Sequence, residues 1–482
     1  MTLLLYSCAR TMFLKRVVAL LALIVSTLCT AAVTQAAEPA SRPNILLIVS
    51  DDQGYPDLGC IGSKPIQTPN LDRLAAEGVR ATSFYVSWPA CTPSRSSILT
   101  GRYPQRNGLY DMVRNDLVNY GHRYSWDEYA VSPEMTLGLD PREVTIGDML
   151  RTVGYATGVV GKWDMGQAKR YLPLQRGFDF FYGHGNNGID YYTHERYGVP
   201  SMFRGNARTE EDKGAYATQV FGREAIGFLK QHLGQRPVFL YLPFNAPHGA
   251  STLAEDNGGQ KPGVQAPEEY VAKYRGIVKD EKLARYMAAV TCMDEVIGDV
   301  LKVVEDAGQT DNTIVMFLSD NGGSGNGGNA PLKGSKSTMW EGGLRVPFLM
   351  RWPYKVPAGK VTDEFLTALE IVPTLLAATG ASAPAGVKLD GFDMLPVVRG
   401  ETASSRTEMF WQRRGDKAAR VGHWKWVDSA KGGGLFDLNA DIGESTDLSG
   451  QKPDIARKLR ERFVAWQQEM DAGPPRGPFR DY

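Results

Sequence analysis

Short apolar runs that end in polar side chains constrain the fold of this 482-residue chain most strongly. A strand that is apolar throughout must be buried on both faces, which is typical of a parallel sheet covered by helices. Amphipathic helical patterns lie between these runs, so the sequence predicts an open α/β fold. The apolar runs are residues 44–49, 156–160, 238–242 and 313–318, and the predicted helices are 70–77, 145–152, 216–232 and 282–307.

The polar side chains that follow these runs predict where the functional site lies. In open α/β sheets, ligands bind outside the carboxyl ends of the strands. Packing alone does not explain why several strands deliver polar groups to one edge. The residues concerned are Asp51, Asp52, Lys162, His248, Asp320 and Asn321.

The character of the sequence changes beyond about residue 400. Strand patterns at 408–412, 420–427 and 435–438 precede a helical pattern at 453–470. They predict a small antiparallel sheet with one helix packed against it. We therefore expect a catalytic α/β domain over residues 37–400 and a small C-terminal α+β subdomain over residues 401–482. The glycine-rich stretch 322–334 is expected to form a loop over the site.

Composition indicates an ordinary globular protein, with 43% hydrophobic and 22% charged residues. Lys+Arg and Asp+Glu are equal at 54 each, so net charge gives no reason to expect nucleic acid as a partner. Any preference for anions must come from a local cluster of cations.

The N-terminus has the pattern of a secretory signal peptide, residues 1–36. Lys15 and Arg16 precede an apolar run at 17–33, and small residues then favour cleavage after Ala36. Met12 is an alternative start that keeps this basic segment. The pattern predicts a periplasmic or secreted protein with no stable membrane span after cleavage. A retained membrane anchor is the alternative interpretation.

Cysteine usage argues against a disulfide framework. Only Cys60, Cys91 and Cys292 remain after cleavage of the predicted signal peptide. Cys60 and Cys292 could pair or remain buried thiols, and the second interpretation is favoured.

Two pairs of oxygen donors, Asp51-Asp52 and Asp320-Asn321, predict a metal site. Adjacent buried carboxylates repel one another, and a divalent cation removes that cost. Ligands that are all oxygen favour calcium or magnesium over zinc. For either pair alone, turn formation is an equally good explanation.

The run Cys91-Thr92-Pro93-Ser94-Arg95, which continues to Gly101-Arg102, predicts a short helix. Thr92 can cap this helix, Pro93 suits its first turn, and it should stop near Gly101. The N-terminal end of a helix attracts anions, and Arg95 lies about one turn further on. The alternative is a buried cysteine beside a solvated arginine.

Lys162, His248 and Lys336 would add cations or proton donors to the site. Taken singly, a lysine is usually solvated and a histidine usually structural. Only their place among the other motifs gives them a predicted catalytic or substrate-binding role.

The chain resembles the formylglycine-dependent sulfatases of the alkaline phosphatase superfamily. The resemblance covers nearly the whole mature chain and rests on landmarks in a fixed order. These are Asp51-Asp52-Gln53-Gly54, Thr68-Pro69-Asn70-Leu71-Asp72, Cys91–Arg95 with Gly101-Arg102, Gly161-Lys162-Trp163, Asn245–His248, Asp320-Asn321-Gly322, Glu341-Gly342-Gly343, Leu435–Leu438 and Gly443-Glu444.

The resemblance implies an alkaline-phosphatase-like α/β core, a calcium ion, and a maturation enzyme that oxidises Cys91 to formylglycine. The implied calcium ligands are Asp51, Asp52, Asp320, Asn321 and the modified Cys91. It also implies that Arg95, Lys162, His248 and Lys336 surround the sulfate of the substrate.

One position departs from the family pattern. The family usually has Gly-Lys-Trp-His where this chain has Gly161-Lys162-Trp163-Asp164, and that histidine assists the last chemical step. A carboxylate can also accept a proton, but it adds negative charge beside a sulfate. Asp164 is therefore a candidate catalytic residue whose role differs from the family pattern.

These residues together suggest hydrolysis of a sulfate ester. In this hypothesis Asp320 takes a proton from the nucleophile, His248 protonates the leaving oxygen, and Asp164 acts as a base in the final step. Two alternatives remain. One is a phosphonate or phosphate ester hydrolase of the same superfamily, and the other is a sulfated-glycan binding protein that has lost catalysis.

An exported location suggests a sulfated carbohydrate as substrate. His184, Tyr191 and His194 lie in one stretch whose rings could stack on a sugar in an outer pocket. An ordinary surface loop is the alternative. The sequence does not identify the sugar, the sulfated carbon, or exo against endo action.

Overall fold

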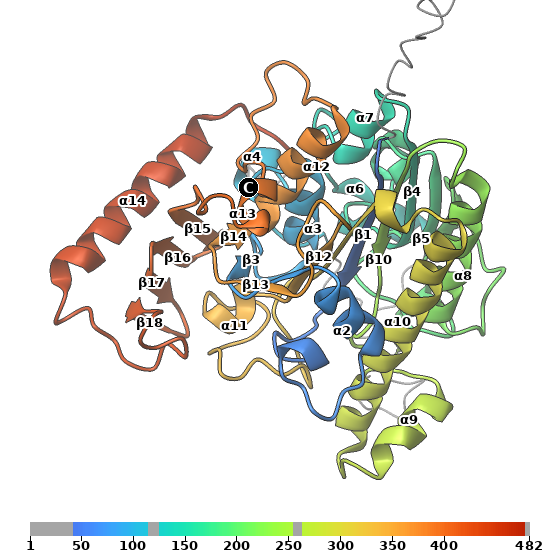
Figure 1. Cartoon of the computed structure of the whole chain (residues 1–482), viewed down its shortest axis with the longest axis horizontal. Helices are drawn as coiled ribbons and strands as arrows, with labels where there is room; N and C mark the ends of the chain where they lie inside the picture. Colours follow the sequence, from blue (N-terminus) through green and yellow to red (C-terminus); the bar gives the residue numbers. More distant parts are fainter. Residues whose placement is uncertain (1–41, 114–124, 254–262, 478–482) are drawn as a thin grey trace, which may run out of the picture. The chain divides into compact units, whose positions relative to one another are not determined.

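The computed structural model describes residues 42–113, 125–253 and 263–477, and a ten-stranded sheet dominates this part of the chain (Figure 1). The strand order is β13-β2-β12-β11-β1-β10-β4-β5-β8-β9. Five neighbours, β11 to β5, are parallel, and β12 and β8 add antiparallel partners on either side. The strands are β1 (Asn44–Ser50), β2 (Val79–Ala81), β4 (Ala156–Lys162), β5 (Phe180–His184), β8 (Met202–Arg204), β9 (Ala207–Arg208), β10 (Val238–Pro243), β11 (Thr313–Ser319), β12 (Phe348–Arg351) and β13 (Lys360–Thr362).

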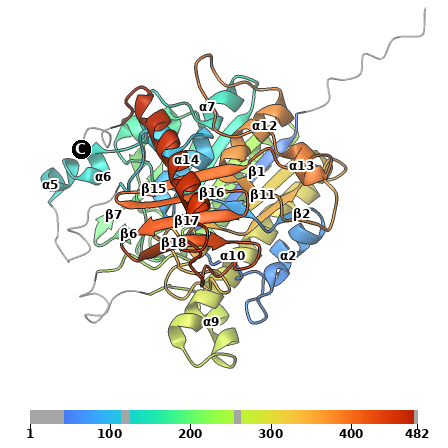
Figure 2. The same ribbon diagram turned by 90° about the vertical axis from the view of Figure 1, so that its left-hand side faces the viewer.

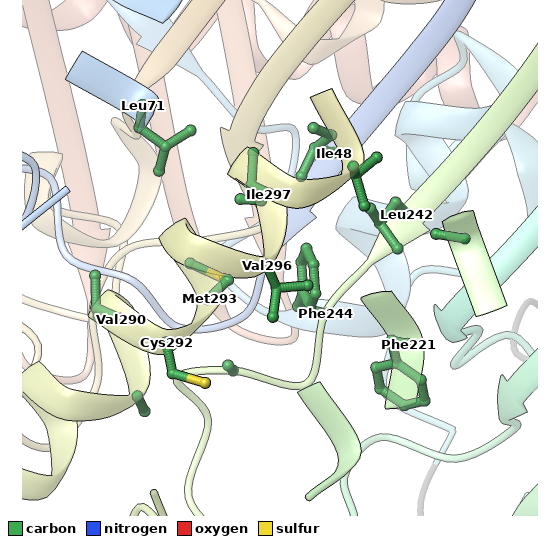
Figure 3. Packing of buried hydrophobic residues seen from close by; sticks show 14 of the residues in the cluster. Ile48, Leu71, Phe221, Leu242, Phe244, Val290, Cys292, Met293, Val296 and Ile297 are labelled. Atoms are coloured by element: carbon green, nitrogen blue, oxygen red, sulfur yellow. The ribbon is translucent and has the colours of Figure 1, made fainter. Parts of the chain in front are cut away.

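Both faces of the sheet are buried, as the apolar strands predict. Along β1, Leu46 and Ile48 enter one hydrophobic cluster and Ile45 and Leu47 enter another, because successive side chains point to opposite faces. Figure 3 shows the first cluster, where Ile297 packs near Ile48. The helices of the first cluster are α2 (Pro69–Ala76), α8 (Ala217–His232), α9 (Glu268–Arg275) and α10 (Glu281–Asp306). Those of the second are α3 (Cys91–Thr100), α7 (Ile146–Arg151), α12 (Ile371–Thr379) and α13 (Leu395–Arg399).

Shorter elements connect these layers. They are α4 (Pro104–Asn107), α5 (Trp126–Ala130), α6 (Pro133–Thr136), α11 (Glu341–Leu344), the strand pair β3 (Phe84–Tyr85) and β14 (Leu366–Thr367), and the strand pair β6 (Glu195–Arg196) and β7 (Val199–Pro200).

A second sheet lies near the C-terminus, as predicted. It is antiparallel, in the order β15 (Glu408–Arg413), β16 (Asp416–Val421), β17 (Trp424–Ser429) and β18 (Gly432–Asp437). The helix α14 (Pro453–Ala472) lies across it through Phe463 and Trp466 (Figure 2). This sheet and helix belong to the same compact unit as the large sheet. The predicted fold class is therefore confirmed.

Two local predictions were wrong, and one strand was not predicted. Thr92 does not cap α3, because the helix already begins at Cys91 and extended backbone at Ala90 precedes its first turn. The single strand predicted at 420–427 is a hairpin, because Gly422 adopts a positive φ of 59° and turns the chain. The strand β5, which carries His184, was not predicted at all.

The predicted signal peptide lies outside the described residues. Among the described helices, none combines the length and apolar character needed to cross a bilayer. Within the same part of the chain, Cys60, Cys91 and Cys292 are free thiols.

A buried charge network joins the small sheet to the large domain. The Nζ atom of Lys425 on β17 lies 2.8 Å from a carboxylate oxygen of Glu341 and 2.9 Å from one of Glu444, and all three side chains are 0% exposed. The backbone N–H of Glu341 also donates to Glu444, at 2.7 Å. One lysine therefore compensates two buried acidic side chains at this joint.

We predict that Lys425→Ala destabilises the protein by about 3–5 kcal/mol, because it leaves the buried Glu444 without its cation and Glu341 with only Arg345, at 3.5 Å. Thermal unfolding followed by circular dichroism measures the effect. Lys458→Ala, at an exposed lysine of α14, is the control and should unfold like the wild type. Equal unfolding temperatures for the two variants would contradict a stabilising role of this joint.

Candidate active site

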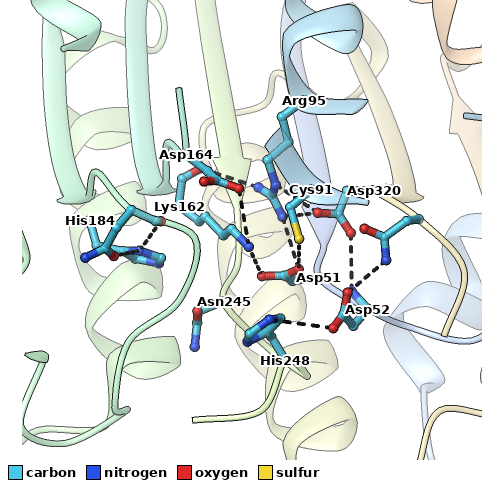
Figure 4. Close-up of polar contacts among 12 residues, drawn as sticks. Asp51, Asp52, Cys91, Arg95, Lys162, Asp164, His184, Asn245, His248 and Asp320 are labelled. Atoms are coloured by element: carbon cyan, nitrogen blue, oxygen red, sulfur yellow. Dashed lines mark hydrogen bonds and ion pairs between the residues drawn. The ribbon is translucent and has the colours of Figure 1, made fainter. Parts of the chain in front are cut away.

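The carboxyl ends of five parallel strands place the predicted site residues in one row. In sheet order, β11 is followed by Asp320 and Asn321, β1 by Asp51 and Asp52, and β10 by Asn245 and His248, while β4 and β5 end at Lys162 and His184. Figure 4 shows the labelled members of this row in the same order across one cluster. The prediction that one sheet edge gathers these side chains is therefore confirmed for Asp51, Asp52, Lys162, His248, Asp320 and Asn321.

Cys91 enters this row from the side, at the first turn of α3. Its Sγ atom lies 3.4 Å from Oδ1 of Asp51 and 3.3 Å from Nζ of Lys336. Every residue of α3 is buried, so this helix fits into the interior rather than along the surface. Gly101 ends it in the left-handed conformation, with φ of 66°.

Arg95 holds the acidic cluster together from the same helix. Its Nε and Nη2 atoms lie 2.9 and 2.8 Å from Oδ2 of Asp320, and its Nη1 donates to the backbone oxygen of Lys162 at 3.4 Å. Lys162 in turn places Nζ 2.6 Å from Oδ2 of Asp51. Both cations are fully buried, so they compensate carboxylates that water does not reach.

Asp52 binds the groups on the outer side of the cluster. Nζ of Lys336 lies 2.7 Å from its Oδ1, the amide of Asn321 donates to Oδ1 at 2.8 Å, and Nε2 of His248 lies 3.7 Å from its Oδ2. The side chains of His248 and Lys336 are 21% and 19% exposed, whereas those of Asp51 and Lys162 are 0% exposed. The open side of the site therefore lies at His248 and Lys336.

The same cluster could hold a metal ion. Asp51, Asp52, Cys91 and His248 each offer one ligand atom, and these atoms all lie within 4.8 Å of one another. The amide oxygen of Asn321 is buried and has no hydrogen-bond partner in the protein. Three carboxylates and a free amide oxygen form a donor set that suits a hard cation.

All three residues predicted to line an outer pocket, His184, Tyr191 and His194, are instead part of the interior, and the last two are hydrogen-bonded to the backbone there. Tyr191 is 0% exposed, and its hydroxyl donates to the backbone oxygens of Asn245 and His248 at 2.9 and 2.8 Å. His194 is 4% exposed, and its Nε2 lies 2.9 Å from the backbone oxygen of Ala215. Their ring faces are therefore not presented to a sugar, and Tyr191 supports the loop that carries His248.

Asn245 was not predicted as a site residue, although it follows a buried strand as Asp51 and Asp320 do. It is 1% exposed and lies in the row between His184 and His248 (Figure 4). Its place after β10 was the signal that sequence reasoning could have used.

Comparisons with known proteins agree with this arrangement. The pattern of the Sulfatase family matches residues 43–381, and that of the N-sulphoglucosamine sulphohydrolase C-terminal region matches residues 335–469. The chain belongs to the sulfatase family. It is a sulfuric ester hydrolase, and the predicted family membership is confirmed.

Similar proteins include arylsulfatase J of Mus musculus, which is 31% identical over 92% of this chain and 78% of its own length. N-acetylgalactosamine-6-sulfatase of Homo sapiens is 32% identical over 85% of this chain and 76% of its own length. Among solved structures, Ps i-CgsB in complex with k-i-k-neocarrahexaose has a TM-score of 0.77 and 31% identity, over 88% of this chain and 93% of that chain.

The electrostatics of this sulfatase keep Cys91 protonated. Burial raises the pKa of the Cys91 thiol well above its usual value, and the nearby Asp51 carboxylate adds to the rise more than Lys162 opposes it. A thiolate, not a thiol, is the nucleophile of cysteine chemistry. The unmodified cysteine of this sulfatase is therefore a poor nucleophile in this setting.

Asp164 carries an unusual carboxyl group. Burial raises its pKa to about 7, although Lys162 and Arg95 oppose the rise. Its nearest cation is Nζ of Lys162 at 3.8 Å, and both carboxylate oxygens lack a hydrogen-bond partner. The backbone at Asp164 has a positive φ of 57°. The group can thus exchange a proton near neutral pH.

We predict that Asp164→Asn becomes more stable relative to the wild type as pH rises from about 5 to about 8. A carboxyl whose folded pKa lies above its unfolded value stabilises the fold when protonated, and this contribution is lost as pH rises through the folded pKa of about 7. The relative gain should be about 2–3 kcal/mol. Urea unfolding at both pH values measures it, with Asp454→Asn, at an exposed carboxylate, as the control. A difference that does not change with pH would contradict the raised pKa.

Proposed function

We propose that this sulfatase is exported and hydrolyses sulfate esters of a carbohydrate, with a formylglycine made from Cys91 and a bound calcium ion. The observation that carries this proposal is the position of Cys91. Its sulfur lies between the Asp51 carboxylate and the Lys336 ammonium group, at the first turn of a buried helix. A side chain at this point reaches both the acidic cluster and the cations that would bind a sulfate.

The residues present fit both groups. Asp51, Asp52, Asp320 and Asn321 would hold calcium, since they are oxygen donors and the Asn321 amide oxygen has no other partner. A carbonyl at position 91 would supply, once hydrated, the hydroxyl that attacks sulfur, and calcium would offset negative charge on the sulfuryl oxygens. A separate maturation enzyme would have to oxidise Cys91.

The cations of the chain bind and orient the sulfate. Lys162 contacts the cluster through Asp51, and Lys336 contacts it through Asp52. Arg95 is fixed by two contacts to Asp320 and so stays in place during the reaction. Fixed charges in a water-free site stabilise charge that develops in the transition state. Asp320 would take the proton of the nucleophile.

His248 would protonate the leaving oxygen, and its position on the open side of the site supports this role. Burial lowers the pKa of His248 to about 3, and Lys336 contributes to this shift. Its Nδ1 lies 2.7 Å from the backbone oxygen of Gly249 and donates there, so only the charged ring carries a proton on Nε2. A sulfate ester bound beside the ring favours that charged form.

Asp164 acts as the base of the final step. Its pKa of about 7 allows it to be ionised at neutral pH and to accept a proton. Its place next to Lys162 keeps it within the sulfate-binding part of the site.

The substrate class rests on relatives and on the N-terminal pattern. One relative is an N-acetylgalactosamine-6-sulfatase, and Ps i-CgsB was solved with a neocarrahexaose. Both point to a sulfated carbohydrate as the substrate here. The signal-peptide pattern of residues 1–36 supports a periplasmic or secreted location.

We predict that Cys91→Ser lowers turnover of p-nitrophenyl sulfate at least about 1,000-fold, because serine cannot be converted to the hydrated carbonyl in the same way. Steady-state rates of protein coproduced with a maturation enzyme measure this, with an aryl phosphodiester assayed alongside. Cys60→Ser, outside the site, is the control and keeps the wild-type rate. A Cys91→Ser variant as fast as the wild type would refute the mechanism, and faster cleavage of the phosphodiester would favour the superfamily alternative.

We also predict that calcium stabilises the protein. Dialysis against a chelator should lower the melting temperature by about 3 °C, and added Ca²⁺ should restore it, because an ion that binds only the folded state stabilises that state. Asn321→Ala should need about 10-fold more Ca²⁺ or more for the same recovery. Asn439→Ala, at an exposed asparagine, is the control. A melting temperature that is independent of calcium would contradict this assignment.

A further inference from the structure

His184 ends β5 beside the reacting groups, yet it takes no part in the charge cluster. It is the register partner of Lys162 on β4 and is 0% exposed. Its Nδ1 lies 2.9 Å from the backbone oxygen and 3.2 Å from the side-chain oxygen of Asn186. Its Nε2 is buried and has no hydrogen-bond partner in the protein.

A chain of hydrogen bonds fixes which nitrogen of His184 carries the proton. The Ser201 hydroxyl donates to the backbone oxygen of Val199 at 2.8 Å, and the Asn186 amide donates to that hydroxyl at 2.7 Å. The Asn186 side-chain oxygen therefore faces His184 and accepts from Nδ1–H. Burial and the neighbouring Lys162 lower the pKa of His184 well below its usual value, so the ring is neutral. Its Nε2 is then a hydrogen-bond acceptor without a donor.

Asn245 presents a second unpaired group on the other side of Lys162, because β4 lies between β10 and β5 in the sheet. Its backbone oxygen accepts from the Tyr191 hydroxyl at 2.9 Å and from the His248 N–H at 2.9 Å, so the loop is held in place. Both polar atoms of its side-chain amide are buried and have no partner. In Figure 4 this amide lies between His184 and His248.

A buried polar group without a hydrogen-bond partner costs free energy unless a ligand or a water molecule supplies that partner. A sulfate group offers only acceptor oxygens, so it does not satisfy the acceptor Nε2 of His184. A hydroxyl has the chemistry that both residues lack, because it can donate to Nε2 of His184 and accept from the Asn245 amide. We infer that His184 and Asn245 recognise a free hydroxyl of the carbohydrate close to its sulfate ester, and so select which sulfated sugar is cleaved.

This inference rests on the proposed function and deepens it, since it names the substrate as a sulfate ester with a neighbouring free hydroxyl. A site that is built to hydrogen-bond a hydroxyl discriminates against the analogue that lacks it, because its buried groups are then left unpaired. Sugars in which that hydroxyl carries a second sulfate or a glycosidic bond should be poor substrates for the same reason.

The test compares one sulfated sugar with its deoxy analogue. Methyl galactoside and methyl N-acetylgalactosaminide monosulfates are screened first, and the one that is cleaved fastest is paired with the analogue that has hydrogen in place of the hydroxyl nearest the sulfate. The measured quantity is the ratio of the two kcat/KM values. We expect the wild type to prefer the hydroxyl compound by about 10- to 100-fold.

Three variants separate recognition from catalysis. Asn245→Ala and His184→Phe should each bring the ratio at least about fivefold closer to one, as a double-mutant cycle between protein and substrate requires. Lys336 contacts the sulfate part of the site, so Lys336→Ala should slow the hydrolysis of both substrates. It should keep the wild-type ratio of the two kcat/KM values. Two different recognition variants keep the test valid if one of them fails to fold.

The outcomes are distinguishable. A wild-type ratio near one, or a ratio unchanged in both recognition variants, overturns the inference while p-nitrophenyl sulfate is still hydrolysed. Such a result would mean that water molecules alone supply the missing hydrogen-bond partners of His184 and Asn245. If the matured enzyme hydrolyses no sulfate ester at all, the proposed function fails and this inference fails with it.

Discussion

The site depends on one electrostatic constraint, which is that three carboxylates are buried side by side at the edge of the sheet. Asp51, Asp52 and Asp320 are each at most 4% exposed, so water does not screen their repulsion. Arg95, Lys162 and Lys336 each lie within hydrogen-bond distance of one of them. This arrangement is stable only while every charge keeps its partner. The same charges also give a sulfate ester and a metal ion defined places to bind.

The order of the strands determines where each of these groups lies along the edge of the sheet. Along the row from β11 to β5, the groups are acidic after β11 and β1, neutral polar after β10, cationic at the end of β4 and neutral at the end of β5. The acidic end suits a cation, the middle suits a sulfate, and His184 at the far end suits an uncharged part of the substrate. Binding, chemistry and selectivity would then occupy neighbouring positions on one rigid sheet edge, where packing holds each side chain in place.

Much of this arrangement could be predicted from the sequence, because buried parallel strands and the polar residues after them are local signals. The positions of Asp51, Asp320 and His248 followed from that pattern alone. The start of α3 at Cys91 did not, because extended backbone at Ala90 begins the helix without a capping side chain. The tertiary packing of this wholly buried helix determines where it begins more strongly than the preference of Thr92 for a capping position.

The remaining errors share one physical cause, which is that burial of a polar ring is decided by distant partners. Tyr191 looked like a surface residue in a stretch rich in glycine and asparagine, but its hydroxyl finds two backbone oxygens some 54 and 57 residues away in sequence. Asn245 is the converse, a buried amide that the protein leaves without partners. Neither the hydrogen bonds of the Tyr191 hydroxyl nor the missing partners of the Asn245 amide can be seen in a local sequence pattern.

Mass spectrometry of the peptide that contains residue 91 tests the central claim most directly. The protein should be purified from a host that supplies a formylglycine-generating enzyme, and the peptide should be probed with a carbonyl-reactive reagent. The account predicts that the Cys91 thiol is replaced by an aldehyde, while Cys60 and Cys292 remain thiols. An active enzyme in which residue 91 is an intact thiol would contradict it.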